Sequence, residues 1–219
     1  NFLQNHDQTG NRAFGERLAA LVAQAPLRAA TALLLLAPAP PMLFMGEEWA
    51  CVQPFLFFCD FEPELAAAVR AGRRAEFGRF PAFSDPAMLE RIPDPTDPAT
   101  FVDSVLDWSR LQAAPHADWL ALHRRLLALR REAIGPRLAG MDGGSARVDL
   151  HGERAFTVRW RLGDGARLTV AANLGGGPGP RVALPDAPLL YSTHAPPGGG
   201  AGLAPWSVTW WLEPAAGSP

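Results

Sequence analysis

The sequence of 219 residues contains no lysine, one tyrosine and two cysteines. Every basic side chain is therefore an arginine, and the formal net charge at pH 7 is only -2. A charge balance of this kind excludes the strongly basic surface that nucleic-acid binding requires, and the polybasic segment that binds anionic lipid. We expect neither nucleic acid nor a membrane as a partner.

Cysteine is too rare for a disulfide-rich secreted scaffold or for a paired-cysteine metal site. We expect Cys51 and Cys59 to be free thiols in a cytoplasmic protein, and we expect no cofactor. An unbroken hydrophobic run long enough to span a membrane is also missing, because Pro38, Pro40 and Pro41 divide the apolar stretch 29–45. Two shorter buried elements explain that stretch better.

The first half of the chain alternates between strand-like and helix-like segments. Short apolar runs predict strands that are buried on both faces, and runs rich in Ala, Leu and Arg predict helices. The expected strands are 2–4 and 42–45, and the expected helices are 16–24, 26–37, 63–77 and 115–132. The proline-rich segment 78–113 is expected to be irregular, either a functional loop or a segment that wraps around the domain.

The last third changes to alternating or β-branched runs of strand length, separated by Gly/Pro-rich loops. The expected strands are 148–150, 156–160, 168–171, 189–193 and 206–212, with a hairpin turn at 163–165. The fold class is therefore α/β followed by an antiparallel all-β sandwich. We place the domain boundary near residue 135, which gives domains of residues 1–135 and 136–219.

The tripeptide Asn5-His6-Asp7 follows the first expected strand. A carboxylate at the end of a barrel strand can accept hydrogen bonds from two sugar hydroxyls, and a neighbouring histidine can donate another. Such bonds strengthen as the sugar ring flattens toward an oxocarbenium-like transition state. The alternative is a helix-capping Asp7 beside a loop His6.

The segment Glu47-Glu48-Trp49 follows the second expected strand. The carboxylates could be acid/base groups, metal ligands together with His6 and Asp7, or partners of arginines. Because consecutive side chains of an extended segment point in opposite directions, we expect one glutamate to face a cleft and the other to be structural.

Trp49 begins an aromatic cluster that continues with Phe55, Phe57 and Phe58, and these rings could stack on sugars or fill a core. Arg12 and Arg17 are interpreted as loop anchors or as ion-pair partners of the nearby carboxylates. The histidines beyond His6 are expected at the surface; they are His116, His123, His151 and His194.

These motifs together resemble the C-terminal part of the malto-oligosyltrehalose trehalohydrolase family, within the α-amylase superfamily of glycoside hydrolases. The resemblance covers residues 1 to about 135. Asn5-His6-Asp7 is similar to the superfamily motif at barrel strand seven, and 41–49 is similar to strand eight with its following loop. Branching and debranching enzymes fit these two motifs nearly as well; the narrower assignment depends on 4–12, 54–58, 72–77 and 104–108.

The resemblance implies that residues 1–135 form the last two βα units of a TIM-type barrel. Asp7 would be the third catalytic carboxylate, which stabilises the transition state. The substrate-binding residues would be Asn5, His6, Gln8, Thr9, Gly10, Asn11, Glu47 and Trp49. No metal is implied.

By the same resemblance the substrate is maltooligosyltrehalose, and the reaction is retaining hydrolysis of the α-1,4 bond that releases trehalose. The nucleophile and general acid, about 5 Å apart in such enzymes, would lie on strands four and five, in a missing N-terminal part. The chain alone is therefore expected to be inactive. The alternatives are a non-catalytic carbohydrate-binding or interaction module and a fragment of a glycogen branching or debranching enzyme.

Overall fold

The computed structural model describes residues 1–195 and 202–215. The chain divides into two compact units whose segments alternate along the sequence. The first, called the sheet unit, comprises Asn1, 23–41 and 121–219, and the second, called the loop unit, comprises 2–22 and 42–120. The boundary near residue 135 stays a prediction.

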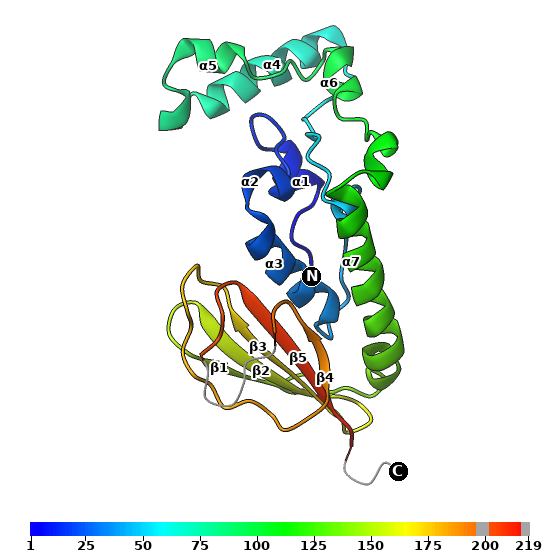
Figure 1. The fold of residues 1–219 in the computed structure, drawn as a ribbon. Coiled ribbons are helices and arrows are strands. Elements are labelled where there is room, and N and C mark those ends of the chain that lie inside the picture. Colours follow the sequence, from blue (N-terminus) through cyan, green and yellow to red (C-terminus); the bar gives the residue numbers. More distant parts are fainter. Residues whose placement is uncertain (196–201, 216–219) are drawn as a thin grey trace. The chain divides into compact units, whose positions relative to one another are not determined.

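The sheet unit is built on five antiparallel strands in the order β1-β2-β3-β5-β4 (Figure 1). Their bounds are Ala146–Leu150 (β1), Ala155–Arg161 (β2), Arg167–Asn173 (β3), Leu189–Ser192 (β4) and Ser207–Glu213 (β5). All five lie where alternation and β-branched residues predicted them. The antiparallel all-β module is thereby confirmed.

The turn between β2 and β3 is also confirmed. Leu162 N–H donates to the Ala166 carbonyl over 2.8 Å, and the Asp164 carboxylate accepts from Ala166 N–H at 2.9 Å. Gly165 has a φ of +88°, a conformation that glycine adopts without steric cost. The hairpin fixes the register in which Val158 lies opposite Val170.

The strands form one sheet, and the second sheet that a sandwich requires does not occur among residues 1–195 and 202–215. A loop covers Ala155, Ala171 and Trp211 through the partly buried side chains Val182, Leu184 and Ala187. Helix α3 (Gln24–Leu36) contacts β5. The sheet therefore buries its side chains under a helix and a loop, and the expectation of a sandwich was wrong in this respect.

Arg130 stabilises the end of α3. It follows α7 (His116–Leu129), in the π-helical turn Arg130–Ile134 that precedes the 3-10 turn Gly135–Arg137. Its guanidinium donates to the carbonyls of Leu35, Ala37, Pro38 and Ala39. These are carbonyls at and just beyond the helix end, where a cation is favoured.

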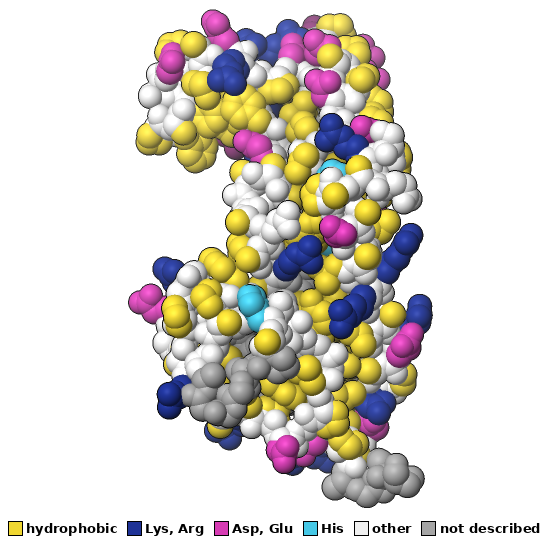
Figure 2. Space-filling model, in the orientation of Figure 1, with side chains coloured by type: hydrophobic (Ala, Val, Ile, Leu, Met, Phe, Trp, Pro, Cys, Tyr) yellow, Lys and Arg dark blue, Asp and Glu magenta, His cyan; other side chains and the backbone are white. Residues whose placement is uncertain are grey.

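The loop unit contains short helices and little other regular structure. They are α1 (His6–Gly10), α2 (Leu18–Leu21), η1 (Glu47–Trp49), α4 (Pro63–Phe77), η2 (Pro81–Phe83), α5 (Pro86–Glu90), α6 (Pro98–Val102) and η3 (Trp108–Gln112). The bounds of α4 agree with the prediction. Figure 2 shows hydrophobic side chains reaching the surface over α4 and α5.

The expectation of an irregular 78–113 was wrong, because four short helices occur there. Asp85 and Asp97 accept hydrogen bonds from backbone N–H groups two residues later, and each precedes a proline at the first helical position. Asp107 caps η3 in the same way through Ser109 N–H. An Asp N-cap followed by Pro is a favourable helix start.

The expected strands 2–4 and 42–45 are not formed within the described residues. A strand requires a neighbour for its ladder of hydrogen bonds. Part of the backbone of 42–45 is engaged by side chains instead: Phe44 N–H donates to Glu47 and the Met45 carbonyl accepts from Arg17. Because neither segment forms a strand here, the two βα units of a TIM-type barrel stay a prediction.

Two histidines expected at the surface are buried: His116 is 8% exposed and His123 is 2% exposed. A ring nitrogen of His116 lies 2.8 Å from the Trp49 carbonyl, and this hydrogen bond satisfies a polar atom that burial removes from water. Cys51 and Cys59 are free, as expected.

No helix in the described part of the chain is both long enough and apolar enough to cross a membrane.

Candidate functional site: the Asp7 loop

Asp7 lies in the first turn of α1, in the loop unit. The helix is capped by Asn5, whose side chain accepts a hydrogen bond from Gln8 N–H at 2.9 Å. Asp7 is therefore not the capping residue, and the alternative interpretation of this aspartate was wrong. Its Oδ1 lies 3.3 Å from Nε2 of His6, and the two side chains are 69% and 71% exposed.

The other expected contact residues of α1 divide into two groups. Gln8 and Asn11 are exposed. Thr9 and Gly10 are buried, and a Cβ at Gly10 would lie 3.6 Å from the Phe55 ring. The buried pair therefore supports the loop, while Gln8 and Asn11 remain available to a ligand.

The loop that carries Asp7 is closed at its base by Gln4 and Gly15. The Gln4 side chain accepts from Leu18 N–H at 3.1 Å, and Phe55 N–H donates to the Gly15 carbonyl at 2.9 Å. Gly15 has a φ of +59°, and a Cβ there would lie 2.4 Å from the Phe55 carbonyl oxygen. Only glycine fits this crossing of two backbones.

Arg17 anchors the segments that follow the two expected strands. It is fully buried, and it donates to the carbonyls of Gln53 (2.6 Å) and Met45 (2.7 Å). Its guanidinium also lies 4.9 Å from the centre of the Phe44 ring. Burial lowers the pKa of Arg17 from its usual value, while the nearby Cys51 and Glu47 oppose that change. Of the two roles expected for Arg17, the structure shows the loop anchor.

Glu47 is buried, and its Oε2 accepts from Phe44 N–H at 3.1 Å. The side chain of Gln4 lies close to this carboxyl, where a hydrogen bond from it favours the charged form. Burial raises the pKa of Glu47 to about 7, against the opposing effects of the Phe44 N–H and Arg17. Glu48 is half-buried. Its burial and the bond from Phe44 N–H favour Glu47 as the structural member of the pair, and which glutamate faces a cleft stays a prediction.

Trp49 is only 1% exposed. Its ring packs against Trp108 with the centroids 4.8 Å apart, in a core cluster with Cys51 and Leu106. Substrate contact by Glu47 or Trp49 stays a prediction, and their burial does not favour it.

The predicted aromatic cluster divides into separate contacts. Phe55 packs edge-on against Phe58, and Phe58 against Phe101. Phe57 instead lies beneath the guanidinium of Arg73. Trp108 joins Phe55, Phe58 and Phe101 around an apolar hollow of about 270 Å³. Apolar walls of this kind offer a sugar few hydrogen bonds.

A group of three or more His, Cys, Asp or Glu side chains that could hold a metal ion does not occur in the described chain. The alternative of a metal site at His6, Asp7 and the glutamates therefore gains no support from the geometry.

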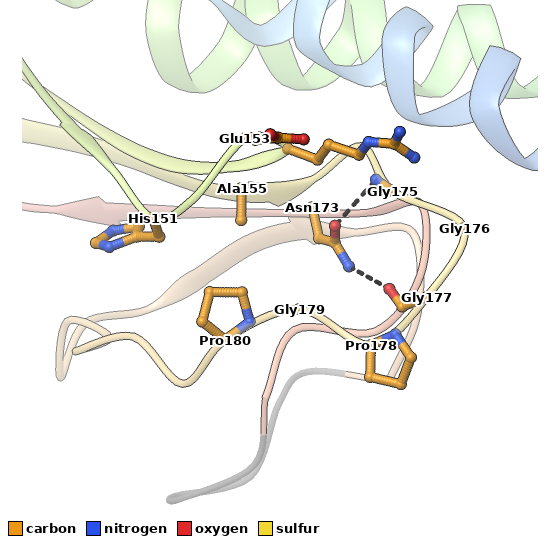
Figure 3. A pocket seen from close by; sticks show the side chains of 11 residues that line it. His151, Glu153, Ala155, Asn173, Gly175, Gly176, Gly177, Pro178, Gly179 and Pro180 are labelled. Atoms are coloured by element: carbon orange, nitrogen blue, oxygen red, sulfur yellow. Dashed lines mark hydrogen bonds between the residues drawn. The ribbon is translucent and has the colours of Figure 1, made fainter.

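The sheet unit contains a polar hollow of about 310 Å³ that the sequence did not indicate (Figure 3). Asn173, 2% exposed, organises one wall: its side chain donates to the Gly177 carbonyl and accepts from Gly175 N–H, both at 2.9 Å. His151 lies at the other side, where it shares a hydrogen bond with Thr157. The Gly/Pro-rich run 175–180 was the signal that could have located it.

Among solved structures, the chain is similar in fold to two enzyme-related chains of which it covers less than half. A crystal structure of an alpha-amylase-like protein from Salmonella typhimurium is 38% identical, with a TM-score of 0.84 over 97% of this chain and 35% of that one. The isomaltulose synthase of Klebsiella sp. LX3 is 14% identical, with a TM-score of 0.57 over 97% of this chain and 42% of that one, and shows the fold alone. Residues 143–210 match a family described as "Domain of unknown function (DUF3459)".

Among curated proteins, the chain matches the C-terminal portion of malto-oligosyltrehalose trehalohydrolases. The protein of Arthrobacter ramosus is 54% identical over 60% of this chain, and that of Deinococcus radiodurans 48% identical over 78%. The protein of Brevibacterium helvolum is 41% identical over 94% of this chain. The matches cover 22%, 29% and 33% of these relatives, so the chain spans a third of their length or less.

Proposed function

We propose that this chain is the part of a retaining glycoside hydrolase that supplies the third catalytic carboxylate, Asp7. The whole enzyme would hydrolyse the α-1,4 bond that joins a maltooligosaccharide to a terminal trehalose, in the cytoplasm. The similarity to trehalohydrolases supports the substrate. The observation that carries the site is an exposed carboxylate on a loop whose base is closed by buried contacts.

In this proposal, residues 1–135 are the last two βα units of a TIM-type barrel. Segments 2–4 and 42–45 become strands when the preceding units supply their neighbours. Asp7 then lies at the carboxyl ends of the strands, where barrel enzymes place their catalytic groups. The partner of this chain is the N-terminal part of the same enzyme.

The role of Asp7 follows from its charge and exposure. Its two oxygens accept hydrogen bonds from adjacent hydroxyls of the sugar that is cleaved, and its charge stabilises the positive charge that develops on the ring. His6, in contact with Asp7, donates a further hydrogen bond. Asn5, Gln8 and Asn11 line the cleft.

Thr9 and Gly10 are the buried residues of α1, and their packing supports the side of the loop that faces away from the cleft. The covalent step needs a nucleophile and a general acid about 5 Å apart, and both are assigned to the N-terminal part. The chemistry that this chain contributes is therefore stabilisation and positioning, with no cofactor.

The test uses the protein encoded by the complete reading frame that contains residues 1–219. We expect this protein to release trehalose from maltooligosyltrehalose, and Asp7→Asn to lower kcat by roughly 10²-fold or more, because a charge that stabilises the transition state is lost. Asp60→Asn, at another exposed aspartate of the loop unit, is the matched control. Unchanged kcat in Asp7→Asn would refute the assignment.

Two further measurements separate the alternatives. The purified 219-residue chain should release no trehalose, and measurable release would show that the nucleophile and acid lie within it. An enzyme of the branching or debranching type would make or cleave α-1,6 bonds, which analysis of the same products detects.

A second candidate function is carbohydrate binding by the sheet unit without catalysis. The observation that favours it is the polar hollow between His151 and the Asn173-organised loop. Saturable binding of maltooligosaccharides to the 219-residue chain, weakened by Asn173→Ala but not by Asp7→Asn, would support this function. Binding weakened only by Asp7→Asn would support the catalytic loop instead.

A further inference from the structure

Arg73, on α4, is a buried cation whose hydrogen bonds go to main-chain oxygens. It is 8% exposed, and no carboxylate forms an ion pair with it within the described residues. Its Nη2 donates to the carbonyls of Gly10 (3.0 Å) and Arg12 (2.8 Å). The guanidinium also lies 4.8 Å from the centre of the Phe57 ring and 5.1 Å from that of Phe77.

Both carbonyls belong to the end of the helix that carries Asp7. Gly10 is the last residue of α1, and Arg12 lies two residues beyond it. Carbonyls at a helix end have no partner within the helix, and they favour a cation there. Asn5 fixes the beginning of α1 through Gln8 N–H, so Arg73 and Asn5 together hold both ends of five residues.

Arginine is suited to this position by its chemistry. A guanidinium can stack on aromatic rings with its faces while its edge donates in the plane, which an ammonium cannot do. Burial lowers the pKa of Arg73 from its usual value, and the nearby Glu76 opposes that change. The group remains charged, because the guanidinium does not lose its proton in proteins.

We propose that Arg73 is a positioning residue for catalysis: it holds the C-terminal end of α1 and thereby fixes where Asp7 meets the substrate. This inference rests on the proposed function of Asp7. A displacement of about 1 Å at a reacting group can cost about 10²-fold in rate. Arg73 touches neither Asp7 nor a substrate, and it acts through the backbone of Gly10 and Arg12.

The chain offers a matched pair of variants. Arg73→Met keeps an unbranched side chain between Phe57 and Phe77 but removes the charge and the donors. Arg74→Met makes the same chemical change at the next residue, which is exposed. Arg73→Lys restores the charge without the planar fork.

The experiment uses the protein encoded by the complete reading frame. We expect amide hydrogen exchange of Asn11 and Arg12, which donate to the carbonyls of Asp7 and Thr9, to be at least about tenfold faster in Arg73→Met, since these local hydrogen bonds then open more often. kcat should fall roughly 10-fold to 100-fold with little change in KM, and Arg73→Lys should recover part of kcat. Arg74→Met should change neither readout.

The outcomes separate this inference from the proposed function. If hydrogen exchange is faster in Arg73→Met but the unmodified protein releases no trehalose, the proposed function is refuted, while the conclusion that Arg73 holds the end of α1 stands. If the unmodified protein is active and Arg73→Met changes neither hydrogen exchange nor kcat, the positioning role of Arg73 is refuted. Equal losses in kcat for Arg73→Met and Arg73→Lys, with loss of global stability and no selective change in the loop, would reduce Arg73 to a packing residue.

Discussion

The sheet unit and the loop unit are stabilised in different ways. In the sheet unit, β3 pairs with a neighbour along its whole length on each side, and residues Leu168–Asn173 are all buried. In the loop unit, single contacts join segments far apart in sequence: Arg17 to Gln53, Arg73 to Gly10, Gly15 to Phe55. Most of the large apolar side chains that are exposed in the described chain also belong to the loop unit.

The difference shows how local damage should spread. Strands that are paired in one hydrogen-bonded sheet unfold cooperatively, so a substitution in the core of the sheet should destabilise every strand together. An anchor made by one side chain holds one crossing, so its loss should open one loop. Four predictions test this contrast, from the largest expected effect to the smallest.

Trp210→Ala should destabilise the whole sheet. Trp210 is fully buried and stacks on Trp160 with the ring centroids 5.7 Å apart, and truncation of such a residue costs about 3–5 kcal/mol. Urea unfolding measures this loss, and hydrogen exchange should show it in all five strands. Leu150→Ala, at a side chain that is 76% exposed, should cost no more than about 0.5 kcal/mol. A change confined to β5 would contradict the contrast.

Glu47 should make stability fall as pH rises. Its pKa is raised from 4.5 to about 7 in the folded chain, so the folded state binds the proton more tightly than the unfolded state. Its contribution is full below pH 4.5 and is lost as pH rises to about 7, a difference on the order of 3 kcal/mol.

Glu47→Gln should remove this slope, and urea unfolding at a series of pH values measures it. Glu48→Gln changes the same charge at a half-buried neighbour, and it should retain most of the slope. An identical slope in Glu47→Gln and the unmodified protein would show that another group titrates.

Arg17→Met should open the crossing at Met45 and Gln53 alone. It leaves two carbonyls without their donor, which costs about 1–3 kcal/mol when the acceptors stay buried. Hydrogen exchange should become faster in 44–56 and remain slow in the sheet strands. Arg12→Met, at a partly buried arginine that donates to the nearby Glu16 carbonyl, is the control. Equal loosening of the sheet would show that the units unfold together.

Gly15→Ala should cost more than Gly140→Ala, by about 1–2 kcal/mol. Both glycines have positive φ, so both substitutions carry the same kind of backbone strain. Only Gly15 adds a steric conflict with the Phe55 carbonyl, because nothing lies within 4 Å of a Cβ at Gly140. Thermal unfolding of the two variants measures the difference. Equal losses would mean that the crossing at Phe55 can widen without cost.

Regular elements were predictable because their patterns are local. The strands of the sheet unit follow period-2 alternation or β-branched residues, and α4 follows from its helix-forming composition. The short helices after α4 were missed although Asp85-Pro86 and Asp97-Pro98 signalled them. The prediction of strands at 2–4 and 42–45 was wrong for a different reason: a strand needs neighbouring strands, and a local sequence pattern does not show whether they are present.

The candidate site was predictable in its residue types but not in its supports. Asn5-His6-Asp7 predicted a candidate site because polar side chains directly follow a short apolar run. Arg73 shares the buried face of α4 with Ala66 and Phe77, at helical spacing, yet its partners are carbonyls whose position depends on the tertiary fold. The pKa of Glu47 likewise depends on burial that the sequence does not show.

The choice of main-chain oxygens as partners has an evolutionary consequence. Arg73 bonds to the backbone at Gly10 and Arg12, and Arg17 to the backbone at Met45 and Gln53. None of these four hydrogen bonds depends on the side chains of Gln8 or Asn11, which are exposed. The side chains at those two positions can therefore change during evolution while the backbone of the loop keeps its place.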